Sequence, residues 1–209
     1  MSYSKTPAAR SSGLDAKGSS PIRLVLLASA VFLLLIVPAF GQTLPRGMTM
    51  HRMQAGELDA SGWATAASTE GGFSVRLPLK FNDFSMIDPD ATSPTLRTFT
   101  VGAKSQEGIK FSATRIVYRK GAESAKYFFS RFEKAQDLGS TPESVTPHRI
   151  GGRSAIDLTL NKASAVSYQR AVLLDSDLLL MIVESPRSHE TTAHQLVSPF
   201  FDSLVVGAR

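Results

Sequence analysis

An unbroken apolar run, LLLMIV at residues 178–183, constrains the fold of this chain more than any other feature. The polar break Asp175-Ser176-Asp177 separates it from a second stretch rich in β-favouring residues. We therefore predict that residues 164–184 form two strands folded on a turn. The first strand alternates, whereas the second is apolar on both faces. Such a strand must be covered from both sides, so it belongs in the middle of a layered structure.

Periodicity predicts the remaining elements on either side of this hairpin. A stripe of phenylalanines at helical spacing predicts a helix over residues 122–136, and a second helical region covers 189–204, starting near Ser188 and interrupted at Pro199. Residues 80–94 and 140–146 lack a period and are expected to be irregular. Further strands are expected at 63–66, 73–78, 96–102, 109–118 and 154–161. The fold class is thus α+β, with an antiparallel sheet flanked by helices.

The net charge of +5 is concentrated near the start of the chain. Residues 1–41 hold four basic side chains and one acidic one, which leaves 19 basic and 17 acidic side chains in the remainder. The remainder contains no dense basic cluster. We therefore expect no nucleic-acid partner.

The N-terminal region has the pattern of an export signal. Residues 1–23 form a disordered basic region, and residues 24–41 contain an uncharged apolar run, Leu24 to Phe40, that ends in Ala39-Phe40-Gly41. Two interpretations fit: a signal peptide cleaved after Gly41, or an uncleaved membrane anchor with its basic end in the cytoplasm. Both place the domain at 62–209 outside the cytoplasm, in the periplasm or anchored at the cytoplasmic membrane.

Residues 42–61 are expected to be a flexible linker, because Gly, Pro, Met and charged residues occur there without a period. Within this range, Met48, Met50, His51 and Met53 are ligand types that suit Cu(I). The sequence lacks a repeat of this cluster, so the linker is the preferred interpretation, and a protein that binds a small ligand or copper through residues 48–53 is an alternative.

Other candidate sites have ordinary structural interpretations. Asp83, Asp88 and Asp90 do not match a calcium loop, because its central Gly and terminal Glu are missing, and a surface turn is expected. Asp157 is expected to form an ion pair near Arg153 or to lie on a solvated face. His189 and His194 are five residues apart, which favours a polar helix start over a zinc site with Glu190.

No enzyme class is indicated by the sequence. Cysteine is absent, which excludes disulfides and thiolate chemistry, and the patterns GxSxG, GxxxxGK and HExxH are absent as well. We therefore predict a protein that is not an enzyme, with no assigned catalytic, cofactor or metal residues. A hydrolase whose groups meet only on folding is the least favoured alternative.

Several short segments, in order, resemble PsbP-like domains. They are a Trp63-led strand, the sequence GGFSVRLP at 71–78, an aromatic helix, Gly151-Gly152-Arg153, the strand LLLMIVES and the closing FFDSL at 200–204. The resemblance, to the group that includes PsbP and the Mog-type proteins, implies an α/β/α sandwich over 62–209. It also implies a non-enzymatic accessory or partner-binding role. With the export signal, it leads us to expect a protein partner in the cell envelope.

Overall fold

The structure is a computed structural model that describes residues 44–136 and 142–207. The expected basic region and the apolar signal or anchor segment lie outside the described residues. No helix within the described ranges is long and apolar enough to cross a membrane.

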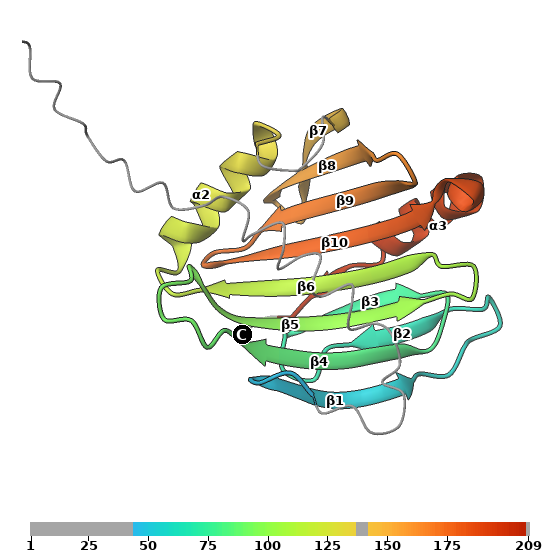
Figure 1. Cartoon of the computed structure of the whole chain (residues 1–209), viewed down its shortest axis with the longest axis horizontal. Helices are drawn as coiled ribbons and strands as arrows, with labels where there is room; N and C mark the ends of the chain where they lie inside the picture. Colours follow the sequence, from blue (N-terminus) through green and yellow to red (C-terminus); the bar gives the residue numbers. More distant parts are fainter. Residues whose placement is uncertain (1–43, 137–141, 208–209) are drawn as a thin grey trace, which may run out of the picture.

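An eight-stranded antiparallel sheet forms the centre of the domain (Figure 1). A smaller three-stranded sheet and two α-helices pack against it. The large sheet consists, in spatial order, of β1 (Met48–Ala55), β4 (Phe81–Ile87), β5 (Thr95–Lys104), β6 (Lys110–Tyr118), β10 (Asp177–Pro186), β9 (Ala165–Leu173), β8 (Arg153–Asn161) and β7 (Pro142–Ile150). The small sheet has the order β11 (Val205–Val206), β3 (Phe73–Leu77) and β2 (Ala64–Ala67).

The predicted hairpin is confirmed as β9 and β10, and β10 lies between β9 and β6 in the large sheet. One face of β10 contributes Leu178, Leu180 and Ile182 to the core under α2 (Ala122–Glu133). The opposite face contributes Leu179 and other apolar side chains to a larger core. β10 is therefore covered on both sides, as its sequence requires.

The two faces of the large sheet are covered by different elements. The buried stripe of α2, including Phe129 and Phe132, lies on one face. The small sheet and α3 (Glu190–Phe201), which follows a short 3-10 turn η1 (Arg187–His189), lie on the other. There Phe200 packs edge-to-face on Phe111, with ring centroids 5.7 Å apart. The chain is thus a mostly antiparallel β structure with helices on both sides of its main sheet.

Three strands occupy ranges that were expected to lack them. β1 lies within the expected linker at 42–61, β4 lies within 80–94, and β7 covers most of 140–146. β4 carries buried polar side chains instead of an alternating pattern: Asp83 is fully buried and accepts hydrogen bonds from Arg52 and Thr69. β7 is polar and contains two prolines, which edge strands tolerate.

The start and interior of the last helix also differ from expectation. α3 continues through Pro199 to Phe201 and is not interrupted there. Its N-cap position is His189, with no side-chain cap, whereas Ser188 lies in η1.

Truncation of the central strand should be strongly destabilising. Leu179 is fully buried between two layers, so Leu179→Ala should lower the free energy of unfolding by about 2–5 kcal/mol through lost burial and a cavity. Urea denaturation of the domain measures this change. Leu96→Ala, at an exposed position of β5, is the matched control and should change stability by less than about 0.5 kcal/mol. Equal effects of the two substitutions would contradict the central position of β10.

Candidate functional site

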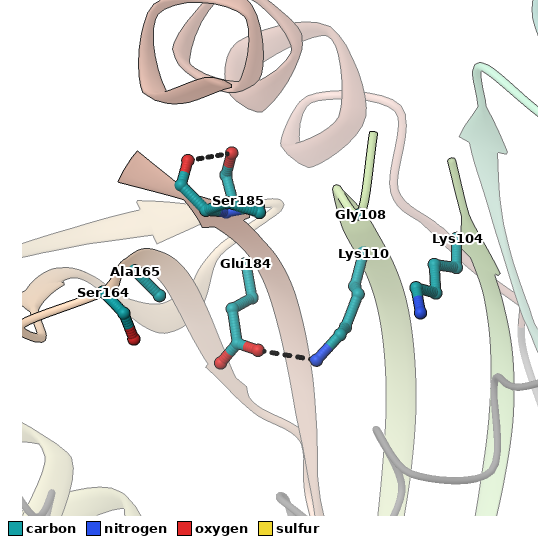
Figure 2. Close-up of a pocket in the computed structure, with 8 residues that line it drawn as sticks. Lys104, Gly108, Lys110, Ser164, Ala165, Glu184 and Ser185 are labelled. Atoms are coloured by element: carbon teal, nitrogen blue, oxygen red, sulfur yellow. Dashed lines mark hydrogen bonds and ion pairs between the residues drawn. The ribbon is translucent and has the colours of Figure 1, made fainter. Parts of the chain in front are cut away.

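A cavity of about 320 Å³ lies at one end of the large sheet (Figure 2). The β5–β6 and β8–β9 turns and the last residues of β10 meet there, because these neighbouring antiparallel strands start or finish at the same end. We call it the lysine–glutamate pocket. Its lining residues are Lys104, Gly108, Lys110, Ser164, Ala165, Glu184, Ser185 and Pro186.

A row of three charged side chains crosses adjacent strands in this pocket. Lys104 of β5 is directly opposite Lys110 of β6, and Lys110 is directly opposite Glu184 of β10. Directly opposed residues of an antiparallel pair project to the same face of the sheet. The register therefore places two ammonium groups and one carboxylate side by side.

The carboxylate of Glu184 is shared by two lysines. Its Oε1 lies 2.9 Å from the Lys110 Nζ, and its Oε2 lies 3.1 Å from the Nζ of Lys162 in the β8–β9 turn. Burial alone would raise the pKa of Glu184, but the hydrogen bond from Lys110 and the charges of both lysines together hold this pKa below its ordinary value. Glu184 is therefore a carboxylate at neutral pH, and its two oxygens are occupied.

Lys104 has no carboxylate partner among the described residues. Like charges directly opposite each other in a sheet are destabilising, and Glu184 is already engaged by Lys110 and Lys162. Glu107, in the neighbouring turn, is fully exposed and hydrogen-bonds to Ser105. The pocket therefore carries an excess of positive charge that packing does not require.

The β5–β6 turn fixes one wall of the pocket. The backbone N–H of Gly108 donates to the Ser105 carbonyl over 3.1 Å, and the N–H of Ile109 donates to the Ser105 hydroxyl over 3.2 Å. Gly108 has a φ of +86°, and a Cβ there would lie 3.4 Å from Pro186. Glycine is suited to this position because other residues rarely adopt that φ.

The geometry of the pocket suits binding of an anion. Ammonium groups offer several N–H donors and a compact positive charge. The Ser164 hydroxyl adds a polar group to the lining. These groups can bind and orient a negatively charged group without any further chemistry.

A second polar cluster joins His51, Ser85, Glu70 and Arg97 on the opposite face of the sheet. The His51 Nε2 lies 3.0 Å from the Ser85 hydroxyl and 3.8 Å from a Glu70 carboxylate oxygen. Arg97 pairs with the same carboxylate. A Ser–His–acid triad needs the acid on the other ring nitrogen, and Ser85 is only 2% exposed. The cluster therefore does not have the geometry of a hydrolase triad.

The structure does not bring the methionine–histidine set together. Met48 and Met50 pack with Phe84 on one face of the sheet. His51 contacts Ser85, which lies on the other face, and Met53 is exposed. A β-bulge in β1 accompanies this division, since the register shifts between Met50 and Arg52. The expected Cu(I) ligands therefore do not converge in this conformation.

The acidic candidates take structural positions. The Asp88 side chain accepts the N–H of Asp90 over 3.0 Å, and Asp90 accepts the N–H of Thr92, so the predicted surface turn is confirmed. Asp83 is separate from them, in β4. No group of three or more His, Cys, Asp or Glu side chains suited to a metal occurs within the described ranges.

Asp157 forms an ion pair, with Arg170 in place of the expected Arg153. Two hydrogen bonds of 2.8 Å join the Arg170 guanidinium to this carboxylate, and a third, of 3.0 Å, reaches Asp202 after α3. Arg170 also stacks on Phe201 at 4.8 Å. The Nε2 of His148 lies 3.3 Å from Asp157 without hydrogen-bond alignment. These contacts attach the end of α3 to the sheet.

The histidines of the last helix do not form a site. His194 packs edge-on against the ring of Tyr168, with centroids 5.7 Å apart. Glu190 pairs with Arg187 and not with either histidine. The expected polar helix start is therefore what the structure contains.

The pocket residues were not singled out from the sequence. Lys104, Lys110 and Glu184 are 80 positions apart at the extremes, and only the strand register brings them into one row. The available signal was Lys104 in the connection between the strands expected at 96–102 and 109–118, with Lys110 at the start of the second strand. These two lysines would have marked a like-charge pair once the hairpin register was known.

No protein family matches the sequence, and no curated protein matches it. Among solved structures, the chain is similar to cyanobacterial PsbP from Synechocystis sp. PCC 6803, determined in solution. The TM-score is 0.45 and the sequence identity 11%, and the match covers 73% of this chain and 96% of that one. The comparison agrees with the PsbP-like resemblance expected from the sequence, as a likeness of fold.

Neutralising each of the two opposed lysines should affect the stability of the protein differently. Lys104→Gln removes a like-charge contact and should leave stability unchanged or raise it by up to about 0.5 kcal/mol. Lys110→Gln takes a partner from the partly buried Glu184 and should lower stability by about 1 kcal/mol. Thermal unfolding of the three proteins in one buffer measures both. A loss of stability in Lys104→Gln as large as that in Lys110→Gln would contradict an unpaired Lys104.

The contribution of Glu184 to stability should disappear in acid. A carboxyl whose pKa is lowered on folding stabilises the protein above its unfolded pKa, and this is lost as the pH falls through the folded pKa. The difference in unfolding free energy between the wild type and Glu184→Gln should therefore be largest near neutral pH. It should shrink as the pH falls below the ordinary pKa range of a glutamate side chain. Chemical denaturation across the acidic range measures the difference. A pH-independent difference would refute the lowered pKa.

Proposed function

We propose that this chain is a non-enzymatic, extracytoplasmic accessory protein that binds an anionic group of its partner in the lysine–glutamate pocket. The observation that carries the proposal is the unpaired Lys104 opposite Lys110 in a hollow of the sheet. Local arrangements that lower the stability of the fold and make no structural contribution are typical of functional sites.

The N-terminal sequence supports the proposed extracytoplasmic location. The apolar run 24–41, preceded by basic residues, suits a signal peptide or an anchor, and both put the folded domain on the outer side of the membrane. In this proposal the partner is a component of the cell envelope, and the specificity resides in the folded domain.

The edges of the large sheet are poorly suited to strand addition, which favours the pocket as the contact site. β7 carries Pro142 and Pro147, and β1 is interrupted by two register shifts. Prolines and bulges on edge strands oppose pairing with another chain. A partner is therefore expected to recognise side chains rather than the backbone of an edge.

Comparative affinity capture tests the proposal. A C-terminally tagged full chain would be captured from soluble envelope and detergent-solubilised membrane fractions, as wild type, Lys104→Glu and Lys126→Glu. Lys126 is exposed on α2, which starts beyond the far end of β6 from the pocket, so it controls for charge reversal alone. We expect a stoichiometric partner with the wild type and Lys126→Glu, reduced about tenfold or more with Lys104→Glu.

Each alternative outcome of the capture contradicts part of the proposal. Equal recovery with all three proteins would exclude the pocket as the contact site. No stoichiometric partner in either fraction would exclude the accessory role. The mass of the N-terminal peptide in the same samples distinguishes cleavage after Gly41 from a retained anchor.

A further inference from the structure

We infer that the lysine–glutamate pocket binds a phosphate monoester. The inference rests on the proposed function, because it assumes that the pocket is the binding site and specifies what the site recognises.

The charge of the pocket matches a dianion better than a carboxylate. Lys104 and Lys110 line the pocket together with Glu184, whose carboxylate also pairs with Lys162 beside the pocket. These four side chains carry three positive charges and one negative charge. A phosphate monoester carries a charge of about −1.5 to −2 at neutral pH, whereas a carboxylate carries only one. A phosphate can therefore neutralise the group, and a single carboxylate leaves it cationic.

The lysines are arranged so that a ligand can contact more than one of them. Glu184 uses separate oxygens for Lys110 and Lys162, so both ammonium groups are held beside the carboxylate. Figure 2 shows the Lys104 and Lys110 side chains extending in the same direction from neighbouring strands. A phosphate between their ends can accept hydrogen bonds from both while Lys110 retains its contact with Glu184.

The donor type also favours a phosphate. Lysine binds phosphate as a point charge and does not require the planar two-pronged alignment that arginine gives to carboxylates. Each ammonium group has three N–H donors, so two phosphate oxygens have donors available from Lys104 and Lys110.

Titration of the purified full chain in detergent tests the inference directly. Inorganic phosphate and glycerol phosphate would be followed by calorimetry and by NMR shifts, with acetate as the monoanionic comparison. We expect phosphate to shift the signals of β5–β6 and β8–β9 turn residues and acetate to bind about tenfold more weakly. Lys104→Gln should weaken phosphate binding about tenfold through loss of a charged donor, whereas Lys126→Gln should not.

A second arm identifies the source of the phosphate group. Phosphatidylcholine vesicles with and without phosphatidic acid would be sedimented with the wild type and both variants, with the apolar segment removed by cleavage after Gly41 or by truncation there. Lys104-dependent binding only to vesicles with phosphatidic acid assigns the site to a lipid headgroup. Binding of glycerol phosphate without vesicle binding assigns it to a soluble ester. Both outcomes support a phosphate site.

Three results would overturn the inference. They are no saturable phosphate binding, equal weakening in both variants, and shifts confined to residues far from the pocket. These results are distinguishable from failure of the proposed function. If phosphate does not bind but partner capture still depends on Lys104, the accessory role stands and the phosphate assignment fails. If phosphate binds in the pocket but no partner is captured, the site stands and the accessory role fails.

Discussion

The burial of β10 on both faces is the constraint on which the rest of the domain depends. Leu178, Leu180 and Ile182 require one apolar cover, and Leu179 and Met181 require another. Because these faces alternate along one strand, no single helix can satisfy them. The chain therefore supplies α2 on one side and α3 with the small sheet on the other. The two apolar faces of this strand therefore require a covering layer on each side of the sheet. The remaining strands extend the sheet on which these layers pack.

Charged contacts position the layers once apolar burial has brought them together. Arg115 of β6 donates to Asp177 at 2.8 Å and to the carbonyl of Gly71 at 2.8 Å, so one guanidinium connects two strands of the large sheet to the turn before β3. Both side chains of the ion pair are almost fully buried. Such a pair adds little net stability, but loss of one partner leaves an unpaired buried charge and costs about 3–5 kcal/mol. The pair therefore disfavours other positions of the small sheet relative to the large one.

The sequence predicted the elements that obey simple periods and missed those that depend on partners distant in the chain. The β9–β10 hairpin, the phenylalanine stripe of α2 and the strands β2 and β3 follow from local pattern. β4 was missed because Asp83 is buried and polar, and its partner Arg52 lies 31 residues away. The pocket was missed for the same reason, since its charges meet only through the register of three strands. Local sequence specifies element type well, whereas the environment of a polar side chain depends on the tertiary structure.

The position of the pocket follows from the same strand that organises the core. β10 is apolar through Val183 and then changes character at Glu184, where the strand leaves the cover of α2. The alternation that directs Ile182 into the core under α2 directs Glu184 to the same face two residues further on. Lys110 is the cross-strand neighbour of Glu184, and Lys104 is the next residue in the same row. These charges therefore lie on the face of the sheet that carries the core under α2, beyond the end of that core. The row carries two lysines and one carboxylate, and in our proposal an anionic ligand supplies the further negative charge.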